Sequence, residues 1–342
     1  MTSKWYRVNL KPLEFYYFAK EVGSRLRSQD SNLEVPYYVV SDEVPSQTTL
    51  LGVMRYYVLK RKDCLSKKCL SNRDSLIGKT SFNYRSKNRQ LFGQIEELTP
   101  LIIRHDETGR VIVPCPMNIV QREGRPHIYK KSSVDASLKK DIYKNYISLF
   151  PDEQLFCTDS ELFHRAIKTR NNKLKDEDAL FKIEMKKLNK NYSFSFFIKV
   201  SDEFEVHKGK EIVFLGGNKS AFSIELHEVA DDTYDNEIKY TRKMLYNMIR
   251  EECWYAISDV YYAIDDDNPK KFASLSKVKG QRNLETNVDR IADSAHRYKC
   301  NDLVTLFKAG SIFYEDPTKW INNDNAKHIG LNQILKLEKI GE

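Results

Sequence analysis

The nine residues YSFSFFIKV, at positions 192–200, are the clearest indicator of the fold. Phe194, Phe196 and Ile198 alternate with serine and other residues, and this period of two is typical of a half-buried β-strand. An extended segment at 179–188 precedes them, and two more follow at 212–215 and 221–229. The sequence therefore predicts a sheet built around this stretch.

Toward the N-terminus one helix stands out among further extended segments. Pro45-Ser46 precedes a run whose apolar residues recur at helical spacing, which predicts a helix beginning at Gln47. Gly52 inside this helix costs about 1 kcal/mol relative to alanine. Close approach by a ligand or another backbone would explain that cost, and a tolerated packing glycine is the alternative.

The remaining segments complete the expected fold class. Residues 64–89 are polar and charged without a clear period and are predicted to be an insert. The other predicted elements are strands at 5–18, 34–40, 94–103, 111–119, 303–314 and 329–336, a loop at 122–140, and helices at 139–150 and 237–254. Because strands outnumber helices, the sequence predicts an α+β fold.

The length of 342 residues favours two domains over a single core. The boundary is predicted near 205–209, which gives an N-terminal domain at 1–205 and a C-terminal domain at 206–342. The N-terminus has no apolar region of a signal peptide, and no apolar run is long enough to cross a bilayer. We therefore expect a soluble, cytoplasmic protein with no membrane partner.

Charge and scattered ligand residues limit the kinds of partner. The net charge of +8 permits an anionic partner such as nucleic acid, and a merely soluble basic protein is the alternative. The six cysteines and seven histidines are dispersed, and no two pairs stand at the spacing of a zinc site. No metal is expected.

The loop Gly216-Gly217-Asn218-Lys219-Ser220 ends in Lys-Ser, as a nucleotide-binding phosphate loop does. It lacks the first glycine of that motif, and a strand follows where the motif needs a helix N-terminus. No nucleotide cofactor is therefore expected. Two glycines can still let backbone amides approach a phosphate closely, with Lys219 adding a cation. An ordinary hairpin turn is the alternative.

The strongest basic segment is His164-Arg165-Ala166-Ile167-Lys168-Thr169-Arg170. Guanidinium and ammonium groups suit a phosphate backbone, and a solvated strand edge is the alternative. His164, surrounded by these cations, is also the best candidate acid or base for a metal-independent ribonuclease. A phosphate-binding or simply exposed histidine is the competing interpretation.

Five ordered stretches resemble one family, the RAMP-superfamily subunit of type III-B (Cmr) CRISPR effectors that holds the 5′ handle of the guide RNA. They are similar to its first helix, its Pro-Leu and Pro-x-Pro strands, its basic strand, its glycine turn and its Ala-Gly-Ser strand with a terminal glycine turn. The stretches are 44–55, 98–102 with 113–118, 165–184, 214–222, and 308–314 with 329–332. The equivalent subunit of type III-A or III-D effectors is the alternative.

The resemblance implies two ferredoxin-like (RRM-like) domains with inserted loops and a non-catalytic role in antiviral defence. It implies a subunit that binds the guide's 5′ handle and contacts the large polymerase-type subunit and the first backbone subunit. The expected RNA contacts are Gln47, Thr48, Gly52, Arg55, His164, Arg165, Lys168, Arg170, Asn171, Gly216, Gly217, Asn218, Lys219 and Ser220. The rival hypotheses are a metal-independent endoribonuclease that processes guide precursors, and a protein-only scaffold.

Overall fold

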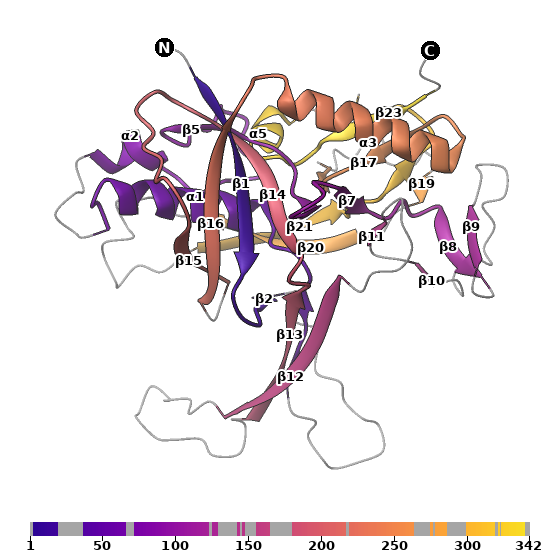
Figure 1. The fold of residues 1–342 in the computed structure, drawn as a ribbon, viewed down its shortest axis with the longest axis horizontal. Helices are drawn as coiled ribbons and strands as arrows, with labels where there is room; N and C mark the ends of the chain where they lie inside the picture. Colours follow the sequence, from indigo (N-terminus) through magenta and orange to yellow (C-terminus); the bar gives the residue numbers. More distant parts are fainter. Residues whose placement is uncertain are drawn as a thin grey trace.

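The strand predicted at 192–200 is β14 (Tyr192–Val200), and it lies inside the largest sheet of the molecule (Figure 1). The structure is a computed structural model and describes residues 3–19, 37–65, 72–122, 125–128, 142–143, 146–147, 155–164, 180–216, 219–262, 274–275, 278–285, 299–318, 321 and 323–338.

The main sheet has the order β11–β7–β6–β14–β1–β16–β15. β6 pairs with the first half of β14, and β5 pairs with the end of β14 on the same side. Every pairing in the main sheet is antiparallel. Its other strands are β1 (Lys4–Pro12), β5 (Ile95–Leu98), β6 (Ile102–His105), β7 (Val111–Pro114), β11 (Tyr146–Ile147), β15 (Glu211–Leu215) and β16 (Ser220–Val229). Because β15 and β16 pair into the sheet of β1, one sheet includes strands from both sides of the predicted boundary at 205. The division into two domains stays a prediction.

The predicted half-burial of β14 is wrong, because eight of its nine residues are buried. Phe194 and Phe196 pack in one apolar cluster with the helix α1 (Gln47–Arg61). On the other face, Phe197 lies 5.5 Å from the ring of Tyr234 in α3 (Thr233–Ile249). Even Ser195 is fully buried, where its hydroxyl donates to Asn9 Oδ1 at 3.0 Å. Both faces of the strand are therefore buried, although alternation alone predicts that one face is exposed.

The helix predicted from Gln47 is confirmed as α1, and local chemistry explains where it begins. Ser46 is in an extended conformation, and its hydroxyl accepts a hydrogen bond from the Thr49 N–H at 3.3 Å. This N-cap satisfies one of the amides that a helix start leaves unpaired. Burial of Leu50, Met54 and Tyr57 then fixes α1 on the sheet, each contributing about 1.5–3 kcal/mol.

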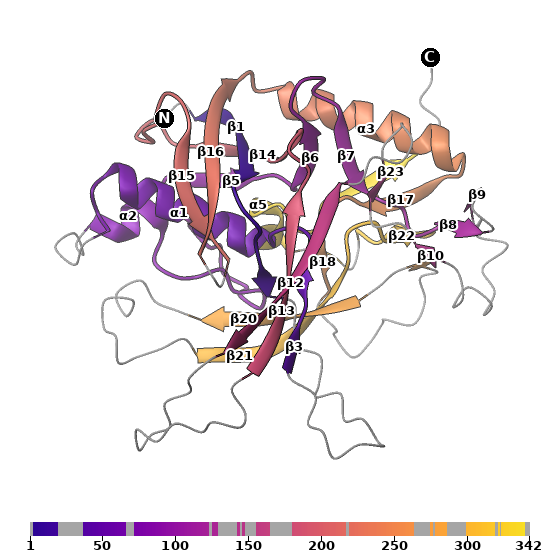
Figure 2. The same ribbon diagram turned by 60° about the horizontal axis from the view of Figure 1, so that its bottom comes forward.

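A long hairpin projects from the body below the main sheet (Figures 1 and 2). Its strands are β12 (Phe156–His164) and β13 (Leu180–Leu188), and β3 (Tyr37–Val39) pairs parallel to β13. Its base is fixed to the body by backbone hydrogen bonds between Tyr16 and Lys186, at 2.8 and 2.9 Å. The segment between the two long strands, 165–179, lies outside the described residues.

The C-terminal half contributes two smaller sheets and the helix α3. One sheet has the order β19–β22–β17–β23 and the other β18–β21–β20. The elements are β17 (Cys253–Ala256), β18 (Val260–Tyr261), β19 (Ser274–Leu275), β20 (Val278–Glu285), β21 (Lys299–Phe307), β22 (Ile312–Phe313), α5 (Asp324–His328) and β23 (Ile334–Leu337). The shorter elements elsewhere are α2 (Arg73–Ile77), β2 (Phe18–Ala19), β4 (Ser41–Asp42), β8 (Ile119–Arg122), β9 (Arg125–Ile128) and β10 (Ile142–Tyr143). Strands outnumber helices among the described residues, as expected for an α+β fold.

Several predicted elements need correction. The single strand expected at 94–103 is divided into β5 and β6, and β9 lies within the segment expected to be a loop at 122–140. The helix expected at 139–150 is wrong where the structure describes it, because β10 and β11 lie there. The helix expected at 237–254 ends at Ile249, where Arg250 adopts a left-handed conformation. The single strand expected at 303–314 is interrupted by a turn at Gly310, whose φ is +92°. The strand expected from 329 begins only at Ile334.

Candidate functional site

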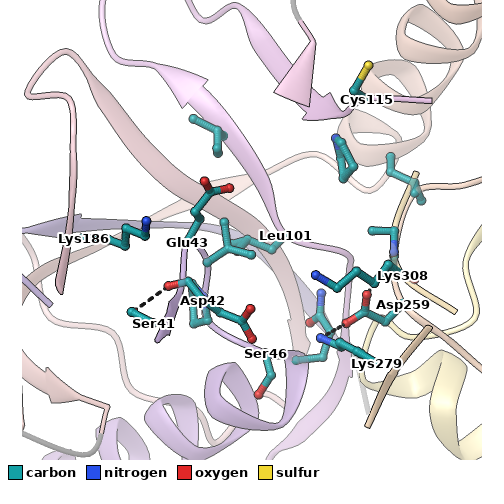
Figure 3. A pocket seen from close by; sticks show the side chains of 18 of the residues that line it. Ser41, Asp42, Glu43, Ser46, Leu101, Cys115, Lys186, Asp259, Lys279 and Lys308 are labelled. Atoms are coloured by element: carbon teal, nitrogen blue, oxygen red, sulfur yellow. Dashed lines mark hydrogen bonds and ion pairs between the residues drawn. The ribbon is translucent and has the colours of Figure 1, made fainter. Parts of the chain in front are cut away.

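A cavity of about 350 Å³ lies at the N-terminus of α1, where parts of the chain far apart in sequence meet (Figure 3). One wall is the segment 40–47 that leads into α1. The others come from β6 and β7, from β13, and from the C-terminal half. Figure 3 shows Lys186 and Glu43 on one side of the cavity, with Lys279, Asp259 and Lys308 on the other.

The cavity is lined by charged groups of both signs. Three lysines, Lys186, Lys279 and Lys308, line it together with the carboxylates of Asp42, Glu43, Glu184 and Asp259. Lys186 is 2.6 Å from Glu184, and Lys279 forms an ion pair with Asp259. Such walls suit a ligand that offers both hydrogen-bond donors and acceptors better than a bare phosphate.

The Lys279–Asp259 pair shows how the cavity holds a buried charge. Burial by itself would lower the pKa of the Lys279 ammonium, but the carboxylates of Asp259 and Asp42 outweigh it and raise that pKa above its usual value. Lys279 therefore stays charged. Because a buried charge without its partner is strongly unfavourable, the pair ties the start of β20 to the segment after β17.

Three of the five stretches that carry the family resemblance, 44–55, 98–102 with 113–118, and 308–314 with 329–332, pack tightly together beside this cavity. The Gln47 amide, oriented to satisfy both partners, donates to the Ile329 carbonyl at 3.0 Å and accepts from the Leu101 N–H at 2.9 Å. A Cβ on Gly330 would lie 2.5 Å from the Thr99 carbonyl. A Cβ on Gly310 would lie 2.4 Å from the carbonyl oxygen of Cys115. These glycines are required because neighbouring backbones leave no room for a side chain.

Of the predicted contacts on α1, two lie on its first turn and two further along. Gln47 is buried and Thr48 is half-buried, its hydroxyl accepting from the Gln281 amide at 3.1 Å. Gly52 is exposed, and an added Cβ would meet nothing within 4 Å. No neighbour in the described part of the chain therefore requires a glycine there, which leaves an external ligand as the surviving functional explanation.

Arg55 contacts the chain itself. Its guanidinium donates to the Thr80 carbonyl at 2.9 Å and lies 5.2 Å from the centre of the Phe92 ring. Burial lowers the pKa of this guanidinium to about 10, so it is still charged at neutral pH. Arg55 therefore anchors the segment that contains Thr80 and Phe92, and the RNA contact that the resemblance implies for it stays a prediction.

The glycine loop connects the antiparallel strands β15 and β16, in which Leu215 pairs with Ser220. Gly216 has a φ of +78°, and a Cβ there would lie 2.4 Å from the Tyr17 carbonyl oxygen. Lys219 is exposed with a φ of +55°, and Ser220 is buried. Gly217 and Asn218 lie outside the described residues. Packing against Tyr17 thus explains Gly216 without a ligand, while Lys219 remains available as an exposed cation.

The basic segment is placed only in part. His164 is the last residue of β12, at the end of the projecting hairpin, and its side chain is outside what the structure describes. Arg165, Lys168, Arg170 and Asn171 also lie outside the described residues. The predicted contacts on the hairpin, on α1 and on the glycine loop therefore stay predictions.

Two candidate features of the site were not predicted from the sequence. The cavity lysines Lys186 and Lys279 carry no local signal, since only the fold brings them together. The second feature is a basic loop at 78–93, which did have a signal. It contains four cations and no acidic residue.

Wider searches of the described residues add two observations. No group of three or more His, Cys, Asp or Glu side chains within the described ranges is arranged to hold a metal ion. Across the same ranges, no helix is long and apolar enough to span a membrane.

Comparisons with known proteins give one family match and matches to solved structures. Residues 34–146 match the family model described as CRISPR-associated protein (Cas_Cmr3). A chain in the cryo-EM structure of the type III-B Cmr-beta complex bound to cognate target RNA is 17% identical, with a TM-score of 0.54, covering 97% of this chain and 96% of that one. A chain of the same complex with target RNA and AMPPnP is 16% identical, with a TM-score of 0.49 and the same coverage. No curated protein matches the chain.

Proposed function

This chain is Cmr3-like, and from that premise we propose that it is an RNA-binding subunit of a type III CRISPR effector complex. In this proposal it holds the 5′ handle of the guide RNA, contacts the large polymerase-type subunit and the first backbone subunit, and acts in antiviral defence without catalysing a reaction. The observation that carries the proposal is the family match over residues 34–146, which include α1, the cavity wall at 40–47 and the wall formed by β6 and β7.

The order of the central strands supports a ferredoxin-like N-terminal domain. The strands β16, β1, β14 and β6 lie side by side and antiparallel, and α1 connects β1 to the strands at the β6 end. This is the arrangement of a β-α-β-β-α-β unit whose fourth strand is β16. Between β14 and β16, where that unit has its second helix, the chain forms β15 instead. A second unit built on α3 and β17 completes the proposed pair.

Co-purification tests the proposal at the level of the particle. The full chain, expressed with the other subunits of its complex, is expected to purify with a short RNA of uniform 5′ end. Filter binding then compares a guide that carries the repeat-derived handle with one whose handle is scrambled. Preference for the intact handle is the expected result. Equal binding of both guides would contradict the handle assignment.

A triple variant of the basic segment tests its role in RNA binding, and a cleavage assay with His164→Ala tests the absence of catalysis. Guide occupancy is expected to fall in Arg165→Ala/Lys168→Ala/Arg170→Ala, because three cations that neutralise phosphates are lost. Unchanged occupancy would remove the basic segment from the site. Repeat RNA incubated without divalent ions is expected to stay intact. Product that disappears in His164→Ala would instead establish the endoribonuclease.

A further inference from the structure

The basic loop at 78–93 lies between α2 and β5, on the side of the molecule formed by α1 and α2 (Figures 1 and 2). It carries Lys79, Arg85, Lys87 and Arg89, and all four side chains belong to exposed residues. No aspartate or glutamate occurs from residue 75 to residue 95. The loop therefore carries four exposed cations and no carboxylate of its own.

The backbones at the two ends of this loop pack closely against each other. A Cβ on Gly78 would lie 2.0 Å from the Leu91 carbonyl oxygen, and one on Gly93 would lie 2.2 Å from the carbonyl carbon of Leu76. Both glycines have positive φ, at +78° and +68°. Only glycine fits such a conformation at such a distance, so the closure of the loop is built into its sequence.

Aromatic side chains anchor the loop from inside. Phe82, Tyr84 and Phe92 are each at most 5% exposed, and the rings of Phe82 and Tyr84 meet edge to face at 4.8 Å. Arg55 of α1 adds its hydrogen bond to the Thr80 carbonyl and its position over Phe92. The apolar part of the loop thus belongs to the core, while its cations face solvent.

Two asparagines at the start of α5 hold the loop backbone. Asn325 donates to the carbonyls of Ser86 and Asn88 at 3.2 and 2.8 Å, and accepts from the Gln90 N–H at 2.8 Å. Asn323 donates to the Tyr84 carbonyl at 2.9 Å. Asp324 between them is exposed and lies 3.9 Å from Lys327. A segment more than 230 residues away in sequence thereby fixes the conformation of the cationic stretch.

From this arrangement we propose that the basic loop is a phosphate-binding surface for single-stranded RNA, in addition to the contacts that the family resemblance implies. The inference rests on the proposed function, because it assumes an RNA partner. A rigid loop loses little conformational entropy when it binds, so its cations contribute most of their attraction to affinity. Arginine and lysine contacts of this kind recognise the backbone rather than the base sequence.

The composition of the surface favours RNA over an acidic protein. Protein interfaces are centred on apolar or aromatic side chains that become buried on binding. All three aromatics of the loop are already buried in its own core, and Leu91, 68% exposed, is its one large apolar side chain at the surface. The adjoining hollow contains Glu96 and Glu97, whose carboxylates repel phosphate, so we place the phosphates over Arg85, Lys87 and Arg89 rather than inside this hollow.

The test measures binding of a 20-nucleotide uridine RNA to the full chain by fluorescence anisotropy over a range of KCl concentrations. The loop variant is Arg85→Gln/Lys87→Gln/Arg89→Gln. Its matched control, Lys208→Gln/Lys210→Gln/Lys243→Gln, removes the same charge from exposed residues outside the loop. Thermal unfolding verifies that both variants fold, and Lys87→Gln alone serves as a milder second variant.

The expected result is a change in salt dependence confined to the loop variant. Each phosphate contact on a single strand contributes about 0.7 to the slope of log K against log salt, so three lost contacts reduce the slope by about 2. If the variants and the wild type bind equally at 1 M salt, the triple variant is expected to bind about 100-fold more weakly than the wild type at 0.1 M salt. For Lys87→Gln alone the expected loss at 0.1 M salt is about 5-fold. The control is expected to keep the wild-type slope.

Three results would overturn the inference. If the loop variant kept the wild-type slope and affinity, the loop would not bind phosphates, while the proposed function would stand. If it kept RNA binding but no longer assembled with the other subunits, the loop would be a protein-docking surface. If the wild-type chain bound no RNA, alone or in its complex, both the inference and the proposed function would fail.

Discussion

Gly216→Ala and Gly52→Ala are the same chemical change, and the structure predicts opposite effects on stability. Gly216 has a φ of +78°, and an added Cβ would lie 2.4 Å from the Tyr17 carbonyl oxygen. The left-handed conformation costs a non-glycine residue about 1–2 kcal/mol, and forcing a backbone apart adds about 1–3 kcal/mol. Gly216→Ala is therefore expected to lower the free energy of unfolding by about 2–5 kcal/mol.

Gly52 lies inside α1, and an added Cβ would meet no atom within 4 Å. Alanine at a helical site loses less conformational entropy on folding than glycine does. Gly52→Ala is therefore expected to raise the free energy of unfolding by about 0.5–1 kcal/mol.

Urea unfolding of the full chain, followed by the fluorescence of its three tryptophans, measures both changes. Guide-RNA affinity is measured on the same two proteins under conditions where both are folded. A Gly216→Ala protein as stable as wild type would refute the packing explanation. If its RNA affinity fell at the same time, Gly216 would be an RNA contact instead. A destabilised Gly52→Ala protein would refute the reasoning at the second glycine.

Three further predictions concern the stability and reactivity of single side chains. Gln47→Leu leaves the Leu101 N–H and the Ile329 carbonyl without their hydrogen-bond partner. The free energy of unfolding is therefore expected to fall by about 2–3 kcal/mol in the same urea assay. An unchanged urea midpoint would contradict this prediction. Asn325→Ala removes a hydrogen bond from the Gln90 amide, and one such bond contributes about 1 kcal/mol. Hydrogen exchange at that amide is therefore expected to become about 5- to 10-fold faster. Equal exchange rates in the variant and the wild type would show that the loop keeps its conformation without Asn325. Cys253 is buried and burial raises the pKa of its thiol to about 12, so iodoacetamide at pH 8 is expected to label the exposed Cys157 and to spare Cys253, as mass spectrometry of the digested protein would show.

The sequence by itself was sufficient for elements whose pattern is local. The alternation in 192–200 predicted β14, and the Pro45-Ser46 start with its apolar spacing predicted α1 from its first residue. It was insufficient where burial on two faces or a distant partner decides the structure. Alternation placed Ser195 at a surface, but both faces of its strand are buried. Two short strands replace the helix expected at 139–150, because β7 and β8 supply the pairing.

For the site, the sequence determined which residue types occur and in what order, including the five stretches that resemble the Cmr family. Only the tertiary structure decided what those residues touch. Gly310 and Gly330 lie where two backbones come into contact. Arg55 contacts the loop at 78–93 through the Thr80 carbonyl, and asparagines at the start of α5 hold the backbone of the same loop. The physical reason is that propensity and periodicity act over a few neighbouring residues. Close packing and ion pairing, as between Lys279 and Asp259, depend on distances in space that the order of residues does not contain.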